Sequence, residues 1–156
     1  MYNEKTGKSV DILCTVFEMT AFMFGEPVEK EELAEQNPPE APLKAEIAFS
    51  GKLNGSLTMM VTEDMCVEIA SSMLGLEEDD PAAIEKSQDA LKEVLNMTCG
   101  NLTTELAGDT EVENLTIPMI YQTTADEWTA LLDHSNTGTL LVEDFPVLLC
   151  LKLEEV

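Results

Sequence analysis

Apolar residues fall on one face of a predicted helix near the start of the chain. Between Ser9 and Phe24 they recur at the i, i+3, i+4 and i+7 spacing that is typical of a helix with one buried side. Gly25 and Pro27 then end the pattern. The segment that follows, residues 26–44, is charged and rich in proline, so we expect a long surface loop with one short helical turn inside it.

Two further helices are predicted from their terminal residues. Thr62 is a suitable N-cap for a short helix that ends at Gly75. Asp80 followed by Pro81 is a strong helix start, because Asp accepts hydrogen bonds from free backbone amides and Pro at the first helical position loses none. That helix can run to Gly108.

Alternation of apolar and polar residues predicts strands in the rest of the chain. Residues 43–62 alternate around Gly51 and Gly55, which indicates a β-hairpin. From Glu111 onward, β-branched and alternating apolar residues predict three or four strands. The segments that carry this pattern are residues 112–122, 127–134 and 137–155. The expected fold class is α+β, with long helices packed on an antiparallel β-sheet.

Length and charge narrow the functions that are open to the chain. Its 156 residues, 44% of them hydrophobic, fit a single domain that spans residues 1–156. The longest uncharged run, Asn114 to Ala125, is too short to cross a membrane, so we expect a soluble cytoplasmic protein. The formal net charge of −23 would repel nucleic acid and anionic membranes, which we therefore exclude as partners.

Cysteine and histidine give no sign of a metal site. The four cysteines lie far apart without a C-x-x-C pair, and the chain has one histidine, so we expect buried, reduced thiols and no bound metal. The segment Asp133 to Asp144 resembles a calcium loop, but Ser135 and Thr137 are weak ligands. A hairpin turn is the better interpretation, and we assign His134 no catalytic role.

The helix that contains Ser87 to Leu106 has an unusual polar side. At about 100° per residue, one side of it gathers a set of residues suited to a core: Leu91, Leu95, Thr98, Leu102 and Leu106. The opposite side gathers a carboxylate pair, a carboxamide and a glycine: Asp89, Glu93, Asn96 and Gly100. Glycine inside a helix costs roughly 1 kcal/mol relative to alanine. We expect that the missing side chain leaves room for a closely approaching partner surface.

A carboxamide beside a carboxylate suits hydrolysis of a phosphoryl group. The amide of Asn96 does not titrate, but it can donate to and accept from a water molecule and so fix its direction. Orienting the attacking water in line is a recognised device in phosphoryl transfer. Glu93, one helical turn away, can pair with a cation on the partner and so position the amide.

These residues resemble a known family, the CheX and CheC phosphatases of bacterial chemotaxis, which are related to the flagellar switch protein FliY. The family signature is a small polar residue, three residues, Glu, two residues, Asn, and a Pro some twenty residues later. Asp89, Glu93, Asn96 and Pro118 match this spacing. The stretch Phe49 to Gly75 also looks like the hairpin and helix that precede the family signature.

The resemblance, which covers residues 45–118, implies a CheC-like fold and a mechanism. The helix would insert into the active site of a phosphorylated CheY-like receiver domain. Asn96 would orient the water that attacks the aspartyl phosphate, and Glu93 would pair with a lysine of the receiver. Asp89 would support the helix or the contact, and Pro118 would be structural. The chain itself would need no cofactor, because the Mg²⁺ belongs to the receiver.

The resemblance also bears on the number of sites and on assembly. CheC proteins carry two signatures, whereas CheX proteins carry one and form homodimers. In the first helix, Glu18 is followed at the Asn position by Ala21, so a second site would lack its water-orienting group. We therefore expect a CheX-like homodimer with one site per chain. The alternative is a non-catalytic adaptor that docks a response regulator or a flagellar switch component, which would bind without accelerating dephosphorylation.

Overall fold

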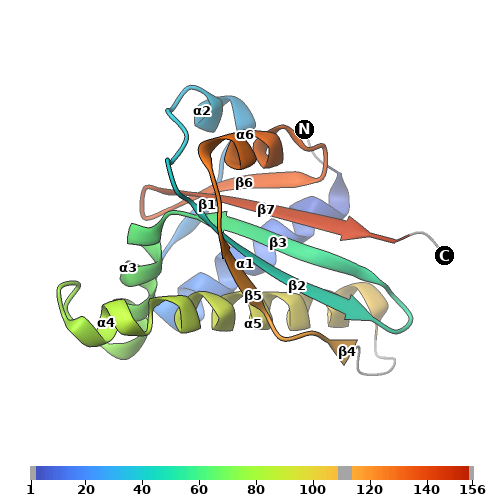
Figure 1. Ribbon diagram of the computed structural model, residues 1–156. Helices are drawn as coiled ribbons and strands as arrows, with labels where there is room; N and C mark the ends of the chain where they lie inside the picture. Colours follow the sequence, from blue (N-terminus) through green and yellow to red (C-terminus); the bar gives the residue numbers. More distant parts are fainter. Residues whose placement is uncertain (1–2, 109–113, 155–156) are drawn as a thin grey trace.

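The computed structural model describes residues 3–108 and 114–154, which form seven strands and six helices (Figure 1). The strands are β1 (Gly25–Pro27), β2 (Leu43–Ser50), β3 (Gly55–Val61), β4 (Asn114–Leu115), β5 (Met119–Gln122), β6 (Thr137–Val142) and β7 (Phe145–Leu153). The helices are α1 (Glu4–Ala21), α2 (Lys30–Ala34), α3 (Glu63–Leu74), α4 (Pro81–Glu85), α5 (Ser87–Ala107) and α6 (Ala125–Asp133).

All strand pairs in the sheet are antiparallel. The order is β1-β6-β7-β3-β2-β4, and β5 also pairs with β2. The predicted hairpin is confirmed as β2 and β3, in the register that places Leu43 opposite Val61. Gly55 begins β3 where the neighbouring strand comes very close, since an added Cβ would lie 2.3 Å from the Lys152 carbonyl oxygen.

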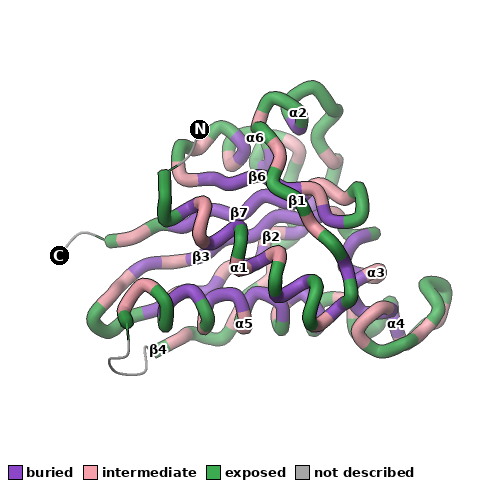
Figure 2. Tube along the Cα trace, turned by 180° about the vertical axis from the view of Figure 1, so that it is seen from behind, coloured by how far each residue is buried: buried purple, intermediate pink, exposed green. Residues whose placement is uncertain are grey.

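Helices cover both faces of this sheet. Helices α1, α3 and α5 pack on one face and enclose the main core, whereas α2 and α6 lie over the other (Figures 1 and 2). Neighbouring residues of one strand divide between the two sides: Met59 belongs to the main core, and Met60 joins Trp128 and Leu132 under α6. The expected α+β class, with helices on an antiparallel sheet, is confirmed.

The predicted helix ends are largely correct. The Thr62 hydroxyl accepts a hydrogen bond from the Met65 amide, and Gly75 ends α3 in the left-handed conformation, with φ 67°. Asp80 accepts from the Ala82 amide at 2.9 Å and caps α4. The continuous helix expected to Gly108 is wrong in one respect. Lys86, with φ −92° and ψ 2°, separates α4 from α5.

The assignment of residues 127–134 to a strand is also wrong. This segment belongs to α6, which begins with a capping box: the Thr124 hydroxyl accepts from the Glu127 amide, and the Glu127 carboxylate accepts from the Thr124 amide. Trp128 and Leu132, one turn apart, are the buried residues of the helix. The spacing of Thr124 and Glu127, which is typical of a capping box, indicates a helix more strongly than the composition of the segment indicates a strand.

Two other segments differ from the prediction. Residues 26–44 contain the expected helical turn, α2, but also most of β1, which pairs with β6. The first helix starts earlier than expected, after Asn3, and ends at Ala21 because Phe22 takes the left-handed conformation. The last third of the chain holds four strands among its described residues, within the expected three or four. Residues 111–113 of that region lie outside the described residues.

The cysteines are unpaired and mostly buried, as predicted. Cys66, Cys99 and Cys150 are buried, whereas Cys14 is half-buried. Burial raises the pKa of the Cys66 and Cys99 thiols to about 12, so both stay uncharged at neutral pH. Along residues 3–108 and 114–154, no helix is long and apolar enough to cross a membrane, and no group of three or more His, Cys, Asp and Glu residues could hold a metal ion.

Candidate active site on helix α5

Apolar packing fixes the rotation of α5 about its axis. The helix contacts α1, α3 and the strands β2, β3 and β5, and Leu91, Leu95 and Leu102 are completely buried in the main core. Thr98 is equally buried, and its hydroxyl donates to the Val94 carbonyl oxygen at 2.8 Å, so the core contains no unsatisfied group there. Leu106, at the helix end, is only partly buried. With this side held in the core, the opposite side faces solvent (Figure 2).

We call the opposite side the α5 stripe: Asp89, Glu93, Asn96 and Gly100. The first three residues are exposed, and their side chains make no hydrogen bond or ion pair with any described part of the chain. Glu93 and Asn96 are three residues apart and therefore neighbours on the helix surface. The structure thus brings the predicted site residues together on one accessible surface, with their polar groups free to bind a partner.

Gly100 is half-buried, but no described residue of the chain requires a glycine there. A Cβ added at Gly100 would meet no atom within 4 Å, unlike one added at Gly55. The residue lies inside a regular helix, where alanine would be the more stable choice. Its backbone carbonyl accepts hydrogen bonds from the hydroxyls of Thr103 and Thr104. Packing among the described residues therefore does not explain the glycine.

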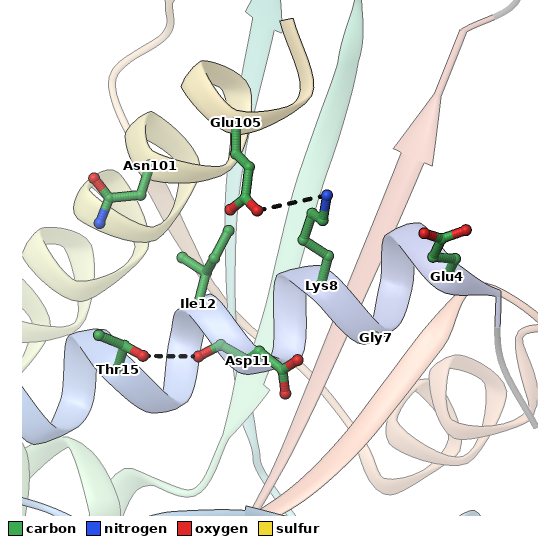
Figure 3. A pocket seen from close by; sticks show the side chains of 8 residues that line it. All are labelled: Glu4, Gly7, Lys8, Asp11, Ile12, Thr15, Asn101 and Glu105. Atoms are coloured by element: carbon green, nitrogen blue, oxygen red, sulfur yellow. Dashed lines mark hydrogen bonds and ion pairs between the residues drawn. The ribbon is translucent and has the colours of Figure 1, made fainter. Parts of the chain in front are cut away.

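The site is a convex surface rather than a cavity. A groove of about 470 Å³ opens between α1 and the far end of α5, where the Lys8 ammonium lies 3.5 Å from the Glu105 carboxylate (Figure 3). Neither Glu93 nor Asn96 lines it. Asn101 and Glu105 do, and sequence reasoning did not single them out, because only the packing of α1 beside α5 creates this groove. A convex polar surface can act on a group that the partner presents.

The other predicted positions are also placed. Pro118 is half-buried in the interruption between β4 and β5, where a residue without an N–H fits the break in strand pairing. On α1, Glu18 is exposed but Ala21 is completely buried. A side chain at position 21 therefore points into the core and could not hold a water molecule for a partner.

The chain is similar to known proteins in sequence and in fold. The family described as chemotaxis phosphatase CheX matches residues 44–135, which is more than half of the chain. No curated protein sequence matches significantly.

Solved structures give the same fold over almost the whole chain. The chemotaxis protein CheX from Vibrio vulnificus superposes with a TM-score of 0.69 at 17% identity, covering 97% of each chain. The CheX of the CheX–CheY–BeF3–Mg²⁺ complex from Borrelia burgdorferi gives 0.64 at 17% identity, covering 97% of this chain and 99% of that one. FliY from Thermotoga maritima gives 0.55 at 14% identity, with 96% and 90% covered. By the match of its sequence to the family, supported by this fold, the chain belongs to the chemotaxis phosphatase CheX family.

Proposed function

We propose that the chain is a phosphatase that removes the phosphoryl group from the aspartyl phosphate of a CheY-like response regulator in bacterial chemotaxis signalling. The observation that carries the proposal is the α5 stripe, on which a carboxylate and a carboxamide stand exposed and unpaired above a glycine that internal packing does not need. Membership of the CheX family and the existence of a solved CheX–CheY complex at 17% identity support it.

The chemistry assigns one task to each residue of the stripe. Asn96 accepts from and donates to a water molecule and holds it in line with the phosphorus. The water oxygen bonds to phosphorus as the bond from phosphorus to the aspartate oxygen breaks. The aspartate is released as a carboxylate, and inorganic phosphate leaves as H2PO4⁻ with both protons of the water. Glu93 pairs with a cation beside the phosphoryl group, and Asp89 supports the contact. Gly100 lets the receiver surface approach. The Mg²⁺ of the reaction belongs to the receiver.

We further propose that two copies form a homodimer in the cytoplasm. Ile117, Met119 and Tyr121, two residues apart, are exposed on or beside β5, and β5 pairs only with β2 among the described strands. An apolar row on a strand that leaves one edge unpaired among the described strands suits association with a second copy. A mass of 17.1 kDa by light scattering, that of one chain, would refute the dimer.

The test is phosphate release from a purified receiver phosphorylated with a small phosphodonor. Wild-type protein should accelerate release, and Asn96→Ala should reduce the acceleration on the order of 100-fold, the typical effect of removing one positioned polar group. Asn101→Ala is the matched control, because Asn101 is also an exposed asparagine of α5 but lies off the stripe. Glu93→Gln should mainly raise the receiver concentration needed for half-maximal rate.

Two outcomes would contradict the phosphatase proposal. If wild-type protein accelerates release from no receiver of its host, the proposal is wrong. If it binds a receiver without acceleration, and Asn96→Ala leaves the affinity unchanged, the adaptor alternative holds instead.

A further inference from the structure

The end of α1 exposes a group of apolar side chains. Met19 and Phe22 are each 73% exposed and Phe24 is 64% exposed; we call these three residues the α1 patch. Between them, Ala21 and Met23 are buried, and the Met23 amide donates to the Phe17 carbonyl oxygen at 3.2 Å. The backbone is therefore anchored while the patch side chains point outward. Exposed apolar side chains within six consecutive residues on an anchored backbone indicate a binding surface.

Phe22 is energetically unfavourable at its position, because of its backbone conformation. It caps α1 in the left-handed conformation, with φ 55° and ψ 33°, which is unfavourable for a residue with a Cβ. The comparable position after α3 is a glycine, Gly75. Phe22 is thus strained and exposed at once, and its large ring gains little from its own chain. Packing among the described residues therefore does not explain an aromatic residue there.

The turn between β6 and β7 holds the last residue of the patch. The Phe24 amide donates to the Glu143 carboxylate at 3.1 Å, and the Glu143 amide donates to the Phe24 carbonyl oxygen at 3.1 Å. Glu143 and Asp144 form the turn with positive φ values of 48° and 71°. This reciprocal pair places a carboxylate directly beside Phe24.

That carboxylate belongs to a crowded acidic group, which we call the acidic rim: Glu68, Glu78 and Glu143. A hydrogen bond to Glu78, partial burial, and the charges of Glu78 and Glu143 together raise the pKa of Glu68 to about 7. The ion pairs among residues 3–108 and 114–154 are Lys8–Glu105 and Lys44–Glu46, so no lysine of this part of the chain neutralises the rim. An external cation would relieve the repulsion.

We propose that the α1 patch and the acidic rim together bind a helix of another protein that carries apolar residues on one face and Lys or Arg beside them. The apolar side chains supply the anchor and the carboxylates select the basic partner. A second copy of this chain or an anionic membrane would bring more negative charge to the rim. Added strands are also disfavoured, because the neighbouring β1 is three residues long and contains Pro27. The inference does not depend on the phosphatase proposal.

The experiment measures binding of a fluorescein-labelled helical peptide made only of Leu and Lys, with a Leu and Glu peptide as the opposite-charge probe. The Leu and Lys peptide should bind the wild type, and Phe22→Asn combined with Phe24→Ser should weaken it about 10-fold or more. Asn tolerates the left-handed conformation, so this variant should fold, which thermal unfolding checks. Glu143→Gln, which keeps an oxygen for the Phe24 amide, should weaken binding about 3-fold.

The control variant is Ile84→Ser, which removes an exposed apolar side chain of α4 without a change of charge. It should leave peptide binding within about 2-fold of the wild type. Equal loss in the Phe22 and Phe24 double variant and in Ile84→Ser, no loss in either, or comparable binding of the Leu and Glu peptide would each overturn the proposal. Binding would then reflect overall charge or nonspecific hydrophobic association.

Discussion

Helices α1 and α5 pack on the same face of the sheet, yet they expose opposite kinds of surface. The α5 stripe is polar, unpaired and ends in a glycine, whereas the exposed end of α1 is aromatic and apolar beside crowded carboxylates. Both helices contain a glutamate followed three residues later by a possible site position. In α5 that position, Asn96, is exposed, whereas in α1 it is the buried Ala21.

The difference lies in how each helix is rotated against the core. Residues three apart differ by about 300° around a helix, which leaves them about 60° from each other. In α5 this arc lies wholly on the solvent side, because the leucines opposite are buried. In α1 the arc crosses the edge of the core between Glu18 and Ala21. The same spacing therefore gives a surface site on one helix and none on the other.

Substitution of Ala21 by Asn is the strongest test of this comparison. An amide placed in the core would lack partners, so Ala21→Asn should destabilise the protein by roughly 2–3 kcal/mol, or about 4–12 °C in Tm. It should add no second site to the phosphate-release assay. Circular dichroism during heating measures the change, and Glu18→Gln, on the exposed side, should leave Tm nearly unchanged.

A stable Ala21→Asn variant with faster phosphate release would show instead that α1 can present the same chemistry as α5. The rotation of the helix would then not decide which spacing becomes a site.

The parts of the fold that the sequence predicts carry local signals. The caps Thr62 and Asp80 act on amides two or three residues away, and the β2–β3 hairpin joins neighbouring segments, so composition and spacing suffice. The polar side of α5 is predictable for the same reason, because one long periodic segment defines both of its faces. Strand β1 is different. Its Gly25 pairs with Val142, more than a hundred residues away, and no local sequence pattern predicts this pairing.

The sequence pattern did not predict the α1 patch, because it did not show where the first helix ends. Phe24 continues the apolar spacing of the first helix and was expected on its buried face, but the helix ends at Ala21 and the side chain is exposed. Termination depends on the conformation of Phe22, a residue type that rarely ends a helix in this way. Periodicity identifies a buried face only as far as the helix continues.

Substitution of Gly100 on α5 should have an effect of intermediate size. Because a Cβ there meets nothing within 4 Å, Gly100→Ala should stabilise the protein by about 0.5–1 kcal/mol and raise Tm by about 1–4 °C. The same methyl group should hinder the receiver and lower the rate of phosphate release severalfold. Thermal unfolding and phosphate release, measured on one preparation, test both effects.

The contrasting variant is Gly75→Ala, where φ is 67° and the substitution should lower stability. Higher stability of Gly100→Ala with an unchanged rate of release would mean that Gly100 leaves room for no partner.

The smallest effect concerns the acidic rim beside α1. The pKa of Glu68 is about 7 in the folded protein against an ordinary value of 4.5, so folding favours its protonated form. This contribution to stability is complete below pH 4.5, falls as the pH rises, and is lost above about pH 7. Glu68→Gln keeps a neutral donor for Glu78 and removes the repulsion. Relative to wild type, its Tm should therefore be higher at pH 8 than at pH 5, by only about 1 °C because the group is partly exposed to solvent.

The exposed Glu18→Gln should show a much smaller change in relative Tm between the two pH values, because Glu18 lies outside the rim. If Glu68→Gln behaves like that control, the three carboxylates do not repel one another measurably. Binding of a cation would then relieve no repulsion in the rim. The end of α1 would differ from the α5 stripe in its apolar side chains alone.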